Sequence, residues 1–189
     1  MEFRFSDDFL KVLEFSRNEA LRTGWRNICP DHIMLAILRH KCNDACRSLL
    51  ACGVDTALFK ECIDEATFVS EEVPWEERET IHLRDSSISM LQHASLEAAR
   101  CHADQITPLH FLLAVSRTAG CFCHDWLDSR GLSLRKLVEA SGLPWAAYGL
   151  AAAAGEAQKS AAAPDPQTLA AAIEKRLREG YSTGNPHLS

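Results

Sequence analysis

The sequence predicts an all-α fold, a bundle of about eight helices arranged as two related halves. Three observations predict it. The segment Phe5–Leu58 aligns without a gap onto Leu83–Lys136, 78 residues further along the 189-residue chain. Apolar residues in both copies recur with the spacing of one helix face. No stretch alternates apolar and polar residues in the way a half-buried strand does.

The two copies share many identical residues at this single offset, which indicates an internal duplication. The identical pairs are Asp7/Asp85, Leu13/Leu91, Glu19/Glu97, Ala20/Ala98, Arg22/Arg100, Ile28/Ile106, Pro30/Pro108, His32/His110, Leu35/Leu113, Ala36/Ala114, Arg39/Arg117, Leu49/Leu127 and Gly53/Gly131. We expect the two halves to be related by a pseudo-twofold axis.

The first helix of the first copy has a clear start and end. Ser6 is a good N-cap, two aspartates follow it, and Gly24 predicts the stop. Its predicted apolar face consists of Phe9, Val12, Leu13, Ser16 and Ala20.

Three more helices follow in the first copy. Pro30 opens the second as its first residue, after Cys29 at the N-cap, and the run 33–38 is apolar almost all round, as in a buried helix. The third is predicted over 44–52, before Gly53. The fourth begins near residue 55 and is expected to carry Leu58, Cys62 and Ile63 inward.

The second copy predicts helices over 85–101, 108–117, 121–130 and 133–141. An acidic connector containing Pro74 joins the copies. We therefore expect one domain over 1–143, with repeats at about 5–66 and 83–141. An Ala-rich linker over 144–165 follows, and then, over 166–189, a short amphipathic helix that ends before Gly180 and a polar tail.

Composition argues against several classes of function. The formal net charge is −6 with no basic block, so nucleic acid is an unfavourable partner. The N-terminus lacks the apolar stretch of a signal peptide and no run of 18 apolar residues occurs, which predicts a cytoplasmic protein without a membrane partner. The eight cysteines are then expected to stay reduced.

The doubled pattern, with N-I-x-P-acid-H-I-x-L-A-I-L in the first copy and Gly53 or Gly131 closing each, resembles the double Clp repeat. This is the N-terminal domain of Clp-type AAA+ unfoldases, and the pattern is most similar to that of ClpC-type chaperones. The resemblance covers about residues 3–143. It implies a non-catalytic, monomeric module that binds the Clp ATPase, adaptors or protein substrates, without a cofactor. No G-x-x-x-x-G-K-[ST] motif of an ATPase occurs.

The same resemblance implies a site for phosphoarginine in each copy, at the start of the second helix. An acid there pairs with the guanidinium, and a Ser or Thr at the start of the first helix helps to hold the phosphate. In this chain Ser6, Asp31 and His32 match that pattern, whereas Leu109 replaces the acid in the second copy. The alternative for Asp31 is an acid that stabilises its own helix, and His32 and His110 are expected to be structural rather than catalytic.

Three apolar residues are candidates for protein docking: Trp75 in the acidic connector, Leu109, and Trp126. The alternative is that the tryptophans only cap the core.

Two other interpretations stay open. Cysteine and histidine residues near the loops, such as Cys42, Cys46, Cys121, Cys123 and His124, suggest a metal or redox site, but they lack the C-x-x-C spacing, so no metal is expected. The chain is alternatively the N-terminal piece of a full-length Clp ATPase.

Overall fold

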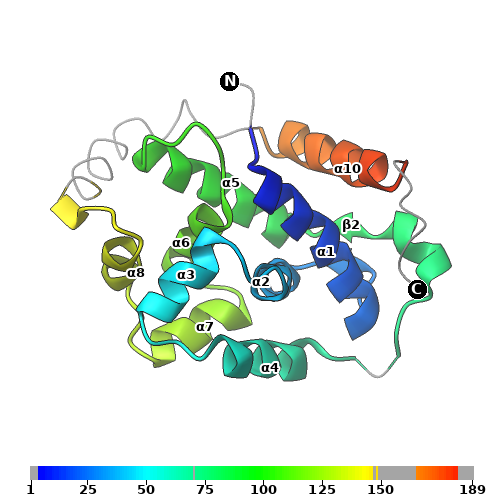
Figure 1. Cartoon of the computed structure of the whole chain (residues 1–189). Coiled ribbons are helices and arrows are strands. Elements are labelled where there is room, and N and C mark those ends of the chain that lie inside the picture. Colours follow the sequence, from blue (N-terminus) through cyan, green and yellow to red (C-terminus); the bar gives the residue numbers. More distant parts are fainter. Residues whose placement is uncertain (1–3, 70, 147, 149–164, 183–189) are drawn as a thin grey trace.

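Two central helices, α2 and α6, organise a bundle built almost entirely of helices (Figure 1). The computed structural model describes residues 4–69, 71–146, 148 and 165–182. The first half contains α1 (Asp7–Thr23), β1 (Asn27–Ile28), α2 (Pro30–Arg39), α3 (Asp44–Ala51) and α4 (Thr56–Thr67). A 3-10 helix, η1 (Trp75–Thr80), precedes the second half, which contains β2 (His82–Leu83), α5 (Asp85–Arg100), α6 (Pro108–Arg117), α7 (Phe122–Ser129) and α8 (Leu134–Ala140). The last described element is α10 (Pro166–Ser182).

The helix boundaries confirm the predicted all-α fold, because local capping chemistry fixes them. Ser6 accepts a hydrogen bond from the Phe9 N–H at 3.2 Å, and Gly24 closes α1 with φ +86°. Residues 33–38 are all buried, as the apolar run predicts. The described ends differ from the predicted ones by one residue at most, except in α10, which continues through Gly180 to Ser182.

Short parallel β pairings join the two halves, and the sequence analysis did not predict them. Ile28, just before α2, pairs in parallel with Leu83, just before α5. In the equivalent place Ile106, before α6, pairs with Phe5, before α1. Each half therefore anchors the start of the other half's first helix, and the Phe9 and Phe111 rings, 6.0 Å apart, continue the contact into the core.

A buried glutamate ties the first two helices of each half together. Glu19 on α1 contacts Arg22 at 2.6 Å and Arg39 of α2 at 3.1 Å. Glu97 on α5 contacts Arg100 and, at 3.6 Å, Arg117 of α6. The three residues of each cluster are identical under the 78-residue offset, so the clusters explain why these charged positions are shared.

The face that α4 presents to the core is shifted by one residue from the predicted one. Phe59 and Ile63 are fully buried, whereas Leu58 is 44% exposed and Cys62 is half-buried. The predicted inward position of Leu58 was therefore wrong. An aromatic side chain buries more apolar area than a leucine, and its placement decides the rotation of this short helix.

The connector between the halves runs against the end of α1. Val69 N donates to Thr23 O at 2.9 Å, and Val73 N donates to Leu21 O at 3.0 Å. A Cβ atom on Gly24 would lie 2.4 Å from the Glu71 carbonyl oxygen, so this close approach requires glycine as well as the left-handed turn.

The C-terminal helix packs on the bundle. α10 lies along α1 and α5 and reaches β2 (Figure 1), with Leu169, Ile173 and Leu177 buried. Tyr148, inside the predicted linker, is also buried and donates a hydrogen bond to Glu97. The residues 147, 149–164 and 183–189 of the predicted linker and tail lie outside the described residues. Within the described ranges no helix has the length and apolar character needed to cross a membrane.

Candidate functional site

Asp31 lies in the first turn of α2, but its carboxylate accepts hydrogen bonds from backbone N–H groups of another helix, α7. Oδ1 accepts a hydrogen bond from Cys123 N at 2.9 Å, and Oδ2 accepts one from Phe122 N at 3.3 Å. These two N–H groups belong to the first turn of α7, where a backbone donor has no partner within its own helix. Asp31 is 8% exposed. It therefore caps α7 across the interface between the two halves.

The equivalent interface between α3 and α6 also has a carboxylate that caps a helix, but there the acid lies on α3 instead of α6. Asp44, in the first turn of α3, accepts a hydrogen bond from Leu109 N in the first turn of α6 at 2.9 Å. Under the pseudo-twofold, α2 and α7 correspond to α6 and α3. One carboxylate is thus present at each equivalent interface, which explains why Leu109 can replace an acid. The Leu109 side chain is itself buried.

His32 and His110 are both bound into the ends of their helices. Nδ1 of His32 accepts from Cys29 N at 3.0 Å, and its Nε2 lies 2.9 Å from the Thr23 hydroxyl. Nδ1 of His110 accepts from Thr107 N, also at 3.0 Å. The pKa of each imidazole is lowered to about 4, mainly by burial, and for His32 the nearby Arg22 contributes to the lowering. Both rings have the hydrogen bonds of structural histidines.

The structure does not bring Ser6 together with Asp31 and His32. His40, which follows α2, lies 3.1 Å from Asp8 at the start of α1, so α1 and α2 run antiparallel and Ser6 lies beyond the end of α2. Ser6 N donates instead to Ile106 O, before α6. With ten residues in α2, Ser6 and Asp31 are separated by roughly 15 Å of helix.

We expect Asp31→Ala to lower the free energy of unfolding by about 2 kcal/mol, because it removes charged acceptors from two backbone N–H groups at a buried interface. Asp31→Asn keeps one oxygen acceptor and should lose about half of that. Urea unfolding followed by circular dichroism measures both. Asp128→Ala, at an exposed position of α7, is the control and should change little. An Asp31→Ala variant as stable as the wild type would contradict the capping role.

Three cysteines surround Asp31, and their environment makes them poor nucleophiles. Cys29, Cys121 and Cys123 are all buried. Burial raises the pKa of Cys121 to about 12 and that of Cys29 and Cys123 above its ordinary value, and the negative charge of Asp31 adds to the effect. Since the thiolate is the reactive and metal-binding form, these thiols are unsuited to redox sensing. Among the described residues no three His, Cys, Asp or Glu side chains are grouped as a metal site would need.

A cleft of about 540 Å³ opens where the two halves meet. The end of α3 and the start of α4 form one wall, and α7, Leu132 and α8 form the other. Residues 52 to 54 on the first wall correspond, at the 78-residue offset, to residues 130 to 132 beside the second. The cleft therefore lies on the pseudo-twofold axis.

Trp126 belongs to the core and lines this cleft from below, with only 6% of its surface exposed. The Phe59 ring stacks on it with centroids 4.0 Å apart, and the guanidinium carbon of Arg130 lies 3.6 Å from its ring centroid. Its indole N–H has no acceptor among the described residues. Leu58 lines the same cleft with 44% of its surface exposed. Tryptophan and arginine, together with partly exposed apolar surface, are typical of the centre of a protein interface.

The cleft also carries charges of both signs. Lys136 and Glu139 of α8 line one side, and Asp55, at the start of α4, lines the other. Asp55 is already occupied as the N-cap of α4, where it accepts from two backbone N–H groups. Of the cleft residues only Trp126 was predicted from the sequence. Leu58 was assigned to the core, and Arg130 has no sequence signal that distinguishes it from other surface arginines.

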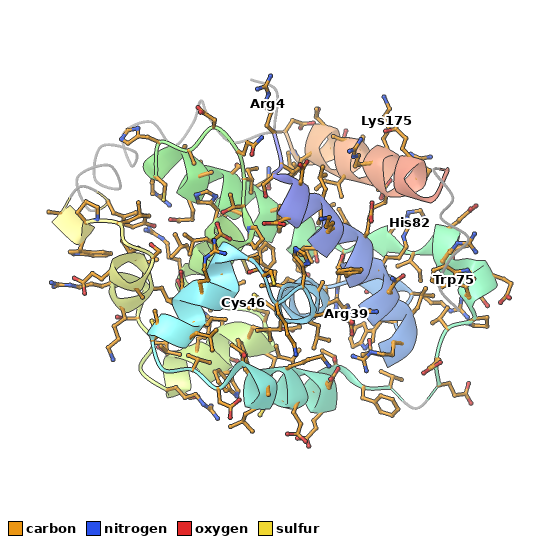
Figure 2. All side chains as sticks on the ribbon, viewed as in Figure 1. Arg4, Arg39, Cys46, Trp75, His82 and Lys175 are labelled. Atoms are coloured by element: carbon orange, nitrogen blue, oxygen red, sulfur yellow. The ribbon has the colours of Figure 1, made fainter. Side chains whose placement is uncertain are left out.

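Trp75 lies away from this cleft, on η1, as Figure 2 shows. It is 50% exposed, and the Arg78 guanidinium carbon lies 4.9 Å from its ring centroid. Phe68 and Val69 of the same connector are exposed as well. The structure therefore separates the three predicted docking residues: Trp75 is on the connector, Trp126 is in the cleft, and Leu109 is buried at the α3–α6 contact.

The sequence of this chain matches a protein-family model and two curated proteins, and these matches agree with one another. The sequence model of the Clp repeat (R) N-terminal domain family matches residues 4–127. Two similar curated proteins are the chaperone protein ClpB of Oceanobacillus iheyensis, 24% identical over 181 residues and 94% of this chain, and the negative regulator of genetic competence ClpC/MecB of Bacillus subtilis, 26% identical over 133 residues and 70% of this chain. The aligned parts make up 22% and 16% of those two proteins, so this chain spans about a fifth of their length. With its duplicated helical bundle and a match over most of its length, the chain belongs to the Clp N-terminal domain family.

Proposed function

We propose that this chain is a non-enzymatic protein-interaction module of the Clp chaperone–protease system and that it docks a protein partner in the cleft beside Trp126. The partner is the Clp ATPase, an adaptor or a protein substrate. The observation that carries the proposal is an aromatic cleft on the axis between the two halves of a Clp-family bundle, edged by the exposed side chain of Leu58.

The dimensions and chemistry of the cleft indicate what it binds. About 540 Å³ accommodates a few side chains of a peptide segment rather than a folded surface. Leu58 and the ring of Trp126 offer apolar contact. Lys136 and Arg130 add cationic groups. A segment that combines an aliphatic or aromatic side chain with a carboxylate matches these groups.

The state of the polar side chains supports a non-enzymatic role. The ring nitrogens of His32 are used in hydrogen bonds within the bundle, and the thiols of Cys121 and Cys123 have a raised pKa because they are buried. Such groups are poorly suited to acid–base or nucleophilic catalysis near neutral pH. A cytoplasmic, monomeric protein that does not bind nucleic acid is part of the same proposal, in line with the net charge of −6.

The proposal is tested with purified components. We expect the full chain to bind a Clp ATPase, or an adaptor of that ATPase, from the same organism and to change the rate at which the Clp protease degrades a substrate. Leu58→Asp should weaken binding about tenfold, because it places a charge on the apolar rim of the cleft. Phe68→Asp is the matched control, since Phe68 is 60% exposed on the connector, outside the cleft.

Two outcomes contradict the proposal. The function itself fails if the chain neither binds any purified Clp component nor changes degradation. The cleft assignment fails if Leu58→Asp binds as well as the wild type, or if Phe68→Asp weakens binding as much as Leu58→Asp does.

Recognition of phosphoarginine by Asp31 stays a more specific prediction. Its carboxylate has the charge to pair with a guanidinium, but a ligand would have to replace or share the two N–H donors of α7. Calorimetric titration of free phosphoarginine into the wild type and into Asp31→Asn tests it. One-site binding that Asp31→Asn abolishes would support it. No heat with either protein would leave protein docking as the only mode of recognition.

A further inference from the structure

The helix α10 contacts the bundle through one narrow apolar stripe. Leu169, Ile173 and Leu177, at positions i, i+4 and i+8, are at most 2% exposed, whereas the neighbouring Ala172 and Arg176 are exposed. The stripe lies on the face made by α1, α5 and β2. Figure 2 shows Lys175 on the outer side of α10, pointing away from the bundle. This is the geometry in which an amphipathic helix binds a groove on another protein.

The fit between α10 and this face is incomplete. A crevice of about 320 Å³ remains between the start of α10 and α5, lined by Ile88, Ser89 and Gln92 on one side and by Pro166 and Ala170 on the other. At the other end of the face, a Glu174 carboxylate oxygen lies 3.4 Å from Nδ1 of His82 in β2. The His82 side chain is still 63% exposed. The face thus extends beyond the area that α10 covers.

The helix is also separate from the rest of the domain in sequence. It lies outside the duplicated segments, although the alignment with ClpB over 94% of the chain reaches it. Residues 149–164 lie between it and the bundle in the sequence, a longer segment than the four to seven residues that separate the helices of each half. Most of the stability of a helix in a protein comes from the packing of its amphipathic face. Its packed state therefore depends on this face, whereas the bundle is complete in its two halves.

We propose that the face formed by α1, α5 and β2 is a helix-binding surface for a partner helix with aliphatic side chains at i, i+4 and i+8, and that α10 occupies it in cis until such a helix competes. A covalently attached helix competes at an effective concentration on the order of millimolar, so only a partner that binds well displaces it. This surface is distinct from the cleft beside Trp126. The inference does not rest on the proposed function.

A peptide with the sequence 165–182 and a fluorescent label is the probe, and fluorescence anisotropy measures its binding to the full chain. Ile173→Glu in the chain should release the tethered helix, because it places a charge in the middle of the stripe. We expect the peptide to bind this variant saturably at one site, roughly tenfold or more tightly than it binds the wild type. Ala172→Glu, with the same new side chain on the exposed face, is the matched control and should behave like the wild type. A peptide that itself carries Ile173→Glu should not bind.

A second way to release α10 leaves the sequences of the helix and of the face that it covers unchanged. A specific protease site inserted between Gly155 and Glu156 allows α10 to be cut from the folded chain, and dilution then favours its release. The labelled peptide should bind the cut chain roughly tenfold or more tightly than the uncut one. The proposal is overturned if neither the cut chain nor an Ile173→Glu chain with a cooperative melting transition binds the peptide. It is also overturned if the intact wild type binds it as tightly as the released forms. Since no Clp component is used, these outcomes leave the proposed function untouched.

Discussion

Lowering the pH from 6.5 to 4 should destabilise the protein by about 3 kcal/mol for each of two buried histidines. The pKa of His32 and of His110 is about 4 in the folded state, against an ordinary value of 6.5. Between these values the unfolded chain binds more protons than the folded one, so the free energy of unfolding falls as the pH falls. Each unit of pKa difference corresponds to about 1.4 kcal/mol. The stabilisation is fully present above pH 6.5 and is lost toward pH 4.

Urea unfolding at a series of pH values measures this dependence. His32→Asn and His110→Asn should each remove about half of the slope that the two residues cause, although each also lowers stability at pH 7 by disturbing a capping box. His93, whose pKa is also lowered by burial, should leave a smaller slope in the double variant. A double variant with the wild-type slope would show that these two histidines are not the groups responsible.

Glu97→Ala should lower the free energy of unfolding by about 3–5 kcal/mol, which is typical when one member of a buried ion cluster is removed. The side chain of Glu97 is 2% exposed, and the substitution leaves Arg100, Arg117 and the Tyr148 hydroxyl without their shared acceptor. Glu97→Gln keeps an acceptor without the charge and should lose less. Urea unfolding at pH 7 gives both values.

The control for this prediction is an ion pair on the surface. Glu139 contacts Arg135 at 2.8 Å, but the two side chains are 48% and 64% exposed, so Glu139→Ala should cost less than about 1 kcal/mol. Glu19→Ala, in the equivalent cluster of the first half, should resemble Glu97→Ala. A loss for Glu97→Ala no greater than that for Glu139→Ala would contradict the clamping role of the buried clusters.

The sequence was a good guide wherever a local rule decides the structure. Ser6 and Gly24 mark the ends of α1 because capping depends on a few neighbouring residues. The Pro-x-His pattern starts α2 and α6 in the same way. The shared Glu19 and Glu97 also indicated the duplication, although their pairing with arginines from the next helix emerged only in three dimensions.

Features that depend on contacts between distant segments were missed. The pairing of Ile28 with Leu83 involves two residues on each strand, too few to show alternation. The family resemblance grouped Ser6 with Asp31, but antiparallel packing of α1 and α2 places these residues at opposite ends of α2. The cap that Asp31 provides to α7 spans 92 positions in the sequence, and no local pattern indicates it.

The cleft shows the same limit. Trp126 stands out in the sequence as a large apolar residue near a helix end, but its neighbours come from four helices. The exposure of Leu58 follows from a one-residue rotation of α4 that periodicity alone does not resolve, since Leu58 and Phe59 both continue an apolar pattern.

Amide hydrogen exchange of the full chain, with and without a purified Clp partner, tests the central claim most directly. Docking in the cleft predicts slower exchange over residues 51–58 and 126–140, with no change over the connector at residues 68–80. Protection confined to the connector, or to the first turn of α2 around Asp31, would contradict the assignment of the cleft as the docking site.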